Sequence, residues 1–135
     1  MLLETFNTSG FVLKSQATRD YVDRLDTDVM VGSSPSEQSK LHFEIINASS
    51  IFIKSDNGKY LSRASSNWIV ANRDTADDSC VFEVEEMDGK ISLKADNGKY
   101  LTRCCGGNVI FNAGRDIIDV WSHFTVEAYN VTSGT

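Results

Sequence analysis

Nearly the same nine residues occur twice in this chain, forty positions apart: "SDNGKYLSR" at residues 55–63 and "ADNGKYLTR" at residues 95–103. Both copies carry an Asp-Asn-Gly triplet between short segments of alternating polarity. Asn and Gly adopt a positive φ at little cost, which a two- or three-residue hairpin loop requires. The duplicated string therefore predicts one tight β-hairpin that the architecture uses more than once.

A third and weaker copy precedes these two. Lys14, Lys54 and Lys94 stand at intervals of forty residues, and a Tyr-X-X-Arg string follows each of them. The first copy carries one extra residue and lacks the Asn-Gly pair. Because the first copy has lost the Asn-Gly pair, we interpret the duplicated string as a structural hairpin rather than as three equal ligand sites.

Each copy continues with an apolar triplet and ends on a similar closing segment. The triplets are "VMV" at 29–31, "WIV" at 68–70 and "VIF" at 109–111, and the closing segments are "HFEI" at 42–45, "VFEV" at 81–84 and "HFTV" at 123–126. The chain therefore consists of three internal repeats. We place them at about residues 9–48, 49–88 and 89–130 of a single domain that spans residues 1–135.

Each repeat holds four short segments with the strand period of two, most clearly in the second repeat at residues 50–54, 59–62, 68–71 and 81–85. Only short helical turns are expected, within residues 34–39, 72–79 and 114–122. Three repeats of four strands are too few for a propeller, which typically has at least four blades. We predict an all-β protein, a closed β-trefoil of twelve strands with pseudo-threefold symmetry.

Eighteen large apolar side chains at matching positions of the repeats are predicted to fill the core. Burial of such side chains stabilises by roughly 1.5–3 kcal/mol each before entropy is counted. The predicted core residues are Phe11, Leu13, Val22, Met30, Phe43 and Ile45 in the first repeat, Ile51, Ile53, Leu61, Ile69, Phe82 and Val84 in the second, and Ile91, Leu93, Leu101, Ile110, Phe124 and Val126 in the third.

The charge and the ends of the chain narrow the class of partner. The formal net charge is −6, and Lys and Arg are scattered singly, which disfavours nucleic acid and anionic membrane surfaces. The N-terminus lacks the positive and apolar regions of a secretory signal, and no apolar run is long enough for membrane insertion. Cys80, Cys104 and Cys105 show no disulfide framework, so we expect free thiols and a cytoplasmic or nucleocytoplasmic protein.

Residues for catalysis or metal binding do not occur in any familiar pattern. His42 and His123 both precede a closing Phe, which favours a packing role, and neither has a companion at metal-ligand spacing. The acidic string "RDTADDS" at 73–79 lacks the EF-hand spacing and predicts a solvated turn. We expect a protein that is not an enzyme and needs neither metal nor cofactor.

One segment has the side chains that sugars bind. Carbohydrate sites on β folds combine an aromatic face with amide and hydroxyl groups. The string "SSNWIVAN" at 65–72 supplies these groups, and the alternative is that its indole is buried, because Trp68 aligns with Val29 and Val109. The predicted carbohydrate-binding residues are Ser65, Ser66, Asn67, Trp68 and Asn72.

The second repeat resembles a known lectin family. The string "IKSDNGKYLSRASSNWIVANRDTADDSCVFEVE" at 53–85 is similar to the agglutinin domain of amaranthin, a plant lectin and β-trefoil. This resemblance implies metal-independent binding of glycans that contain galactose or N-acetylgalactosamine, a homodimer, and a role for Asn67 and Trp68 in the sugar site. Amaranthin has two trefoils per chain and builds its site between subunits. A single trefoil therefore needs an identical partner or a different site.

The third repeat is similar to another trefoil family. The strings "ISLKADNGKYLTR" at 91–103 and "IDVWSHFTVE" at 118–127 resemble the repeat of fascin, which bundles actin with four trefoils. An actin-binding module is therefore an alternative, although one acidic trefoil lacks the valency and the basic patches for bundling. A lectin module of a larger pore-forming protein is a further alternative, because agglutinin-type trefoils are fused to such segments. The sequence as a whole favours the lectin.

Overall fold

The structure is a computed structural model that describes residues 10–16, 19–25, 28–32, 37–63, 69–87, 89–103, 111–115 and 122–128. Twelve strands and two short 3₁₀ turns, η2 (Glu37–Ser39) and η3 (Asp78–Cys80), occur in these ranges, and none of their helices is long and apolar enough to span a membrane. The strands are β1 (Phe11–Ser15), β2 (Tyr21–Leu25), β3 (Asp28–Gly32), β4 (Leu41–Ile45), β5 (Ser50–Ser55), β6 (Tyr60–Arg63), β7 (Ile69–Arg73), β8 (Phe82–Met87), β9 (Lys90–Lys94), β10 (Tyr100–Arg103), β11 (Phe111–Arg115) and β12 (Phe124–Ala128).

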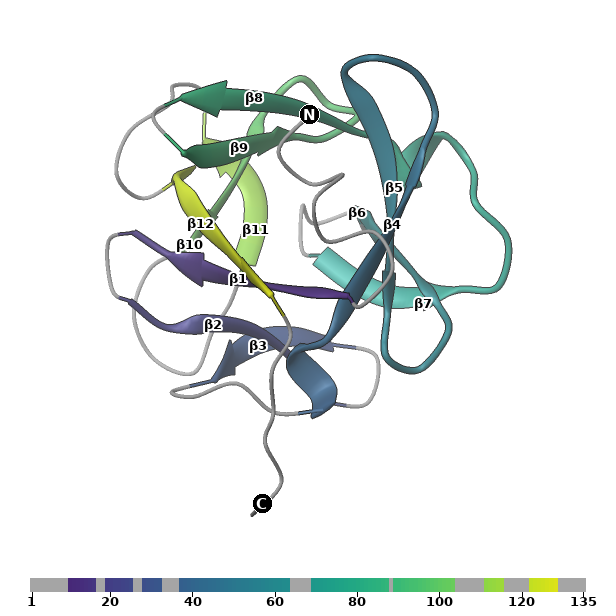
Figure 1. Cartoon of the computed structure of the whole chain (residues 1–135). Coiled ribbons are helices and arrows are strands. Elements are labelled where there is room, and N and C mark those ends of the chain that lie inside the picture. The colour runs from purple at the N-terminus through teal and green to yellow at the C-terminus, as the bar shows by residue number, and fades with distance from the viewer. Residues whose placement is uncertain are drawn as a thin grey trace.

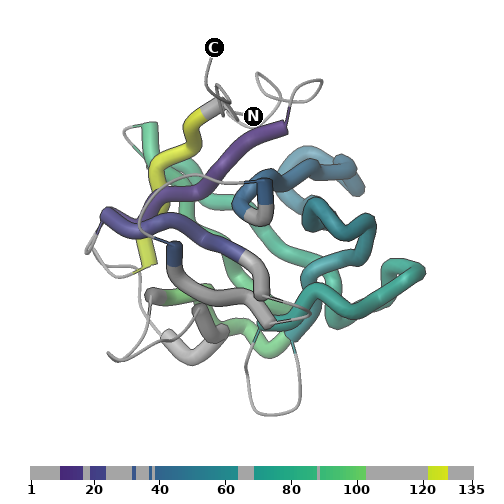
Figure 2. The backbone as a smooth tube through the Cα atoms, turned by 90° about the horizontal axis from the view of Figure 1, so that it is seen from below, coloured from purple at the N-terminus to yellow at the C-terminus, as the bar shows by residue number. Residues whose placement is uncertain are grey.

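Six of the strands close into a barrel. The ring runs β1–β4–β5–β8–β9–β12 and returns to β1, with every neighbouring pair antiparallel. β12 lies between β1 and β9, so the last strand of the chain completes the ring beside the first (Figure 1; Figure 2). Three of the six pairings in the ring, β4–β5, β8–β9 and β12–β1, join strands of different repeats, so no repeat closes the barrel alone.

The other six strands form three hairpins, β2–β3, β6–β7 and β10–β11, each attached to a barrel strand of its own repeat. β3 also pairs with β7, which links two of the hairpins to each other. A six-stranded barrel with three hairpins is the β-trefoil. The predicted fold class and the twelve strands are therefore confirmed.

The duplicated string forms the predicted hairpin turn. Gly58 and Gly98 both have φ +79°, and the amide of each donates to a backbone carbonyl three residues back, over 3.0 Å. In each turn the side-chain oxygen of the preceding Asn accepts from the following Lys amide, also over 3.0 Å. In the longer loop of the first repeat, Arg19 takes the left-handed position instead, with φ 63°. The Asn-Gly pair is thus selected by backbone geometry.

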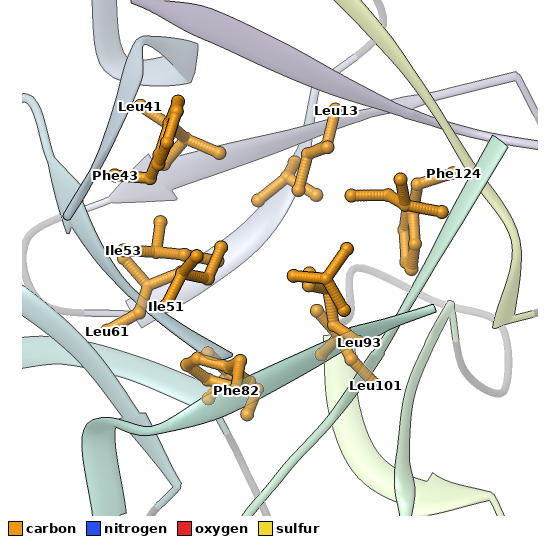
Figure 3. Packing of buried hydrophobic residues seen from close by; sticks show 14 of the residues in the cluster. Leu13, Leu41, Phe43, Ile51, Ile53, Leu61, Phe82, Leu93, Leu101 and Phe124 are labelled. Atoms are coloured by element: carbon orange, nitrogen blue, oxygen red, sulfur yellow. The ribbon is translucent and has the colours of Figure 1, made fainter. Parts of the chain in front are cut away.

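The core is a cluster of buried side chains to which all three repeats contribute (Figure 3). Most predicted core side chains are buried there, and Val126 packs against them while partly exposed. The side chains of Met30 and Ile110 lie outside the described part of the chain. Ile45 contradicts the prediction, because 49% of its surface is exposed.

The strand register explains this error. Leu41, which is 2% exposed, pairs with Ser55, whereas Phe124 pairs with Ser15 in the equivalent place. The closing segment of the first repeat is therefore shifted by two residues from the alignment that the sequence suggested. Since a shift of two keeps each side chain on the same face, alternation alone could not detect it. Ile45 consequently falls at the end of β4, beyond the core.

The same register separates the two histidines. His42 pairs with Lys54, and the residues that pair with the equivalent lysines Lys14 and Lys94 are Thr125 and Glu83. His123 directly precedes β12 and so occupies a different position. The prediction that the two histidines share one slot of the repeat was therefore wrong.

The same group of three polar side chains also occurs three times on the barrel exterior, with the Lys and Tyr from one repeat and the Glu from a neighbouring repeat. A Tyr hydroxyl donates to a Glu carboxylate over 2.6–3.1 Å, and a Lys ammonium lies 4.9–5.6 Å from the centre of the Tyr ring. The pKa of each Tyr is raised, by burial first and then the Glu hydrogen bond at Tyr21, and by the Glu hydrogen bond first at Tyr60 and Tyr100. The three groups are Lys14–Tyr21–Glu127, Lys54–Tyr60–Glu44 and Lys94–Tyr100–Glu85.

Candidate functional site

The predicted sugar-binding segment connects β6 to β7. Ser65, Ser66, Asn67 and Trp68 lie outside the described residues, and the positions of these four side chains remain predictions. The strands on both sides are described, and their last paired residues, Arg63 and Ile69, face each other. Both ends of the segment are therefore fixed by a strand pair.

The register of the flanking strands changes how the repeats align at this segment. Ile69 pairs with Arg63, and the equivalent arginines Arg24 and Arg103 pair with Val29 and Phe111. Ile69 therefore takes the place of Val29, where the sequence alignment had put Trp68. A shift of one residue moves a strand residue to the opposite face.

The residue before Ile69 consequently has a new counterpart. Trp68 precedes Ile69 in the chain just as Asp28 precedes Val29 and Ile110 precedes Phe111, so Trp68 aligns with Asp28 in the first repeat and with Ile110 in the third. Burial of Trp68 had been inferred from its alignment with Val29 and Val109. The register removes the alignment with Val29 and replaces it with a carboxylate in the first repeat, whereas the third repeat still has an apolar residue at this position.

Asn72, the one described member of the predicted site, is exposed and lies on a β-bulge. Tyr60 pairs with Arg73 and Leu61 with Ala71, so Asn72 is the extra residue of β7. The third repeat has the same bulge, since Tyr100 pairs with Arg115 and Leu101 with Ala113, and the first repeat, in which Tyr21 pairs with Gly32 and Val22 with Val31, has none. A bulge bends the strand and redirects a side chain, and bulges are frequent beside functional sites.

Polar side chains from the neighbouring turn surround this end of β7. The Asn57 amide donates to the Ala71 carbonyl over 3.2 Å, which ties the β5–β6 turn to β7. The Lys59 ammonium forms an ion pair with Asp74. Sequence reasoning missed these cross-turn contacts, although the repeated Asn-Gly-Lys string was visible.

The acidic string after β7 serves as a helix cap. The Asp77 side chain accepts from the Ser79 amide over 3.0 Å and from the Ser79 hydroxyl over 2.5 Å, and lies 3.5 Å from Arg73 Nη1. The hydroxyl hydrogen bond is the main cause that lowers the pKa of Asp77. These contacts cap the first turn of η3, so the position of the Asp77 carboxylate is explained without a bound metal ion.

Other reactive groups do not form a second site in the described ranges. There, no cluster of His, Cys, Asp and Glu could hold a metal ion. Cys80 is a free thiol buried in η3, and burial is the largest cause that raises its pKa. Cys104 and Cys105 lie outside the described residues. A high pKa and burial both keep the Cys80 thiol unreactive.

Comparison with known proteins gives the family. The fascin domain family matches residues 26–126, which is most of the chain. The chain belongs to the fascin domain family. Among solved structures, it is similar to a designed threefold-symmetric protein, ThreeFoil, with a TM-score of 0.72 and 15% identity over 88% of this chain and 98% of that chain. At this identity the likeness shows the fold alone, and no curated protein matches.

Proposed function

We propose that this fascin-domain protein is a metal-independent carbohydrate-binding protein. Its predicted site combines Trp68 and Asn67 with Ser65, Ser66 and Asn72, and its ligands are glycans with galactose or N-acetylgalactosamine. The observation that supports this proposal is the β6–β7 register, which aligns Trp68 with the carboxylate residue Asp28 in the first repeat instead of with Val29, and with Ile110 in the third. Because one repeat places a charged residue at this position, the fold does not require a buried side chain there, and an indole at this position can contact a ligand.

The proposed chemistry follows from these side chains. The C–H groups on the apolar face of galactose stack on an indole, and amide groups donate to and accept from the sugar hydroxyls. Asn72 supplies one such amide, exposed on its bulge. A mono- or disaccharide makes few contacts, so one site binds weakly and a homodimer increases the effective affinity.

A glycan array with the wild type and Trp68→Ala tests the proposal. Binding to galactose- or N-acetylgalactosamine-terminated glycans by the wild type, and its loss in Trp68→Ala, is the expected result. Met87→Ala is the matched control, because Met87 is 57% exposed at the end of β8, which pairs with β5 and β9 and not with β6 or β7. Thermal unfolding of all three proteins shows whether the loss reflects the site or the fold. Equal glycan binding by Trp68→Ala overturns this site.

Membership in the fascin domain family supports a second candidate, binding to actin filaments. The chain resembles fascin in its third repeat, and fascin bundles actin with several trefoils. Co-sedimentation with filamentous actin, at low and at physiological salt, tests this candidate with the same three proteins. The actin candidate is favoured if wild type and Trp68→Ala co-sediment with filaments to the same extent and neither binds a glycan on the array.

A further inference from the structure

The exterior of the barrel carries one distinctive face, formed by β4, β5 and the start of β6 (Figure 1). Alternation along β4 buries Leu41 and Phe43 and turns His42 and Glu44 outward. The outward residues of β5 pair with them directly, Lys54 with His42 and Phe52 with Glu44. The β4–β5 face is defined here as Lys40, His42, Glu44, Phe52, Lys54 and Tyr60.

Two partly exposed aromatic rings lie on this face. Phe52 and Tyr60 meet edge to face, with ring centres 5.8 Å apart. The positions equivalent to Phe52, those that pair with the glutamates Glu127 and Glu85, hold Val12 and Ser92. Val12 and Ser92 are 1% and 2% exposed, so both equivalents are covered. Among these three related positions, the β5 position alone holds an aromatic ring that solvent reaches.

The charge of this face also differs from that of its relatives. Lys40 and Lys54 both lie near His42 and, after burial, are the further causes that lower its pKa. Glu44 is the carboxylate of the face, and it is already engaged: it accepts from the Tyr60 hydroxyl over 2.8 Å and lies 3.7 Å from the Lys54 ammonium. The position of His42 holds Glu83 in the second repeat and Thr125 in the third.

The β4–β5 face holds two lysines and a histidine against one glutamate, beside an aromatic ring that solvent reaches, and this combination is complementary to an acidic sugar. We propose that the β4–β5 face is a second subsite that binds a carboxylate-bearing saccharide, with Phe52 against the pyranose ring and Lys54, Lys40 and His42 toward the carboxylate. This inference rests on the proposed carbohydrate-binding function and extends it. The subsite gives the protein a preference for glycans whose terminal residue is acidic.

Lactose and 3′-sialyllactose form a matched pair of probes, because they share the galactose and differ by one acidic sugar. Titrations of the ¹⁵N-labelled protein followed by NMR measure both affinities and locate each probe on the chain. We expect 3′-sialyllactose to bind more tightly than lactose, to shift the amides of His42, Phe52 and Lys54, and to lose this advantage at high salt.

The variants Phe52→Val and His42→Thr introduce residues that the fold already accepts at the equivalent positions, Val12 and Thr125. Loss of the ring is expected to weaken 3′-sialyllactose about three- to tenfold and to leave lactose unchanged. Equal affinity for the two sugars, or an advantage that Phe52→Val retains, overturns the subsite. A hexaglutamate peptide that reproduces the same amide shifts also overturns it, because charge alone is then sufficient. If neither sugar binds, the carbohydrate function itself fails.

Discussion

Arg63 and Asp96 form a two-point ion pair across the boundary between the second and third repeats. The Arg63 Nε lies 2.5 Å from Asp96 Oδ1, and the Nη2 lies 3.2 Å from Oδ2. Arg63 ends β6, and Asp96 belongs to the β9–β10 turn. The duplicated string therefore supplies both partners, its Arg in one copy and its Asp in the next. This contact joins one hairpin to the turn of another repeat.

We expect the Arg63–Asp96 pair to stabilise the fold by about 0.5–1 kcal/mol, since both side chains are only partly exposed and the geometry is bidentate. A double-mutant cycle of Arg63→Met and Asp96→Asn, measured by urea unfolding, isolates this coupling. The coupling should shrink as salt is raised from about 0.05 to 1 M. A coupling free energy near zero at low salt would show that this ion pair does not stabilise the fold.

At turn positions with positive φ, replacing glycine should lower the stability of the fold and introducing glycine should raise it. A Cβ at Gly58 meets no atom within 4 Å, so Gly58→Ala carries only the backbone cost of φ +79°. We expect it to lower the free energy of unfolding by about 1 kcal/mol. Arg19→Gly should raise the free energy of unfolding by up to about 1 kcal/mol, because it relieves the same strain at φ 63°. Destabilisation by both variants would contradict this reading of the turn.

His42 should make the stability depend on pH. Burial first, and then Lys40 and Lys54, lower its pKa below the ordinary 6.5. The unfolded chain therefore takes up the proton more readily, and stability falls as the pH drops through 6.5 toward the lower pKa of the folded state. Urea unfolding at pH 7.5, 6.5 and 5.5 should show a smaller loss for His42→Thr than for the wild type. Equal slopes for the two proteins would exclude His42 as the cause.

The two-residue period of the strands and the forty-residue internal repeat were sufficient to predict the trefoil. The forty-residue spacing of Lys14, Lys54 and Lys94 reflects the three barrel strands β1, β5 and β9. The Asn-Gly turns were predictable because their chemistry is local: Gly58 needs no distant contact to adopt its φ. What these features share is that a few adjacent residues determine them.

Alignment between the repeats could not be predicted as well. The first copy has an insertion in its β1–β2 loop, and its closing segment "LHFEI" carries three apolar residues at alternate positions, Leu41, Phe43 and Ile45. Either the first two or the last two of them can align with the two core positions of this segment. Only the strand pairing shows which alignment is correct, and the paired residue lies on another strand. The alignment of Trp68 with Val29 was wrong for the same reason. The candidate site depends on register, which is a long-range property.

The two ends of β4 supply the last prediction. Leu41 is 2% exposed in the core cluster, whereas Ile45 is 49% exposed at the far end of the same strand. Leu41→Ala should therefore cost about 2–4 kcal/mol of unfolding free energy by leaving a cavity. Ile45→Ala should cost less than about 1 kcal/mol, because half of its surface is already in water. Urea unfolding of both variants measures this order directly. The reverse order would mean that the alignment suggested by the sequence is right and the β4 register is wrong.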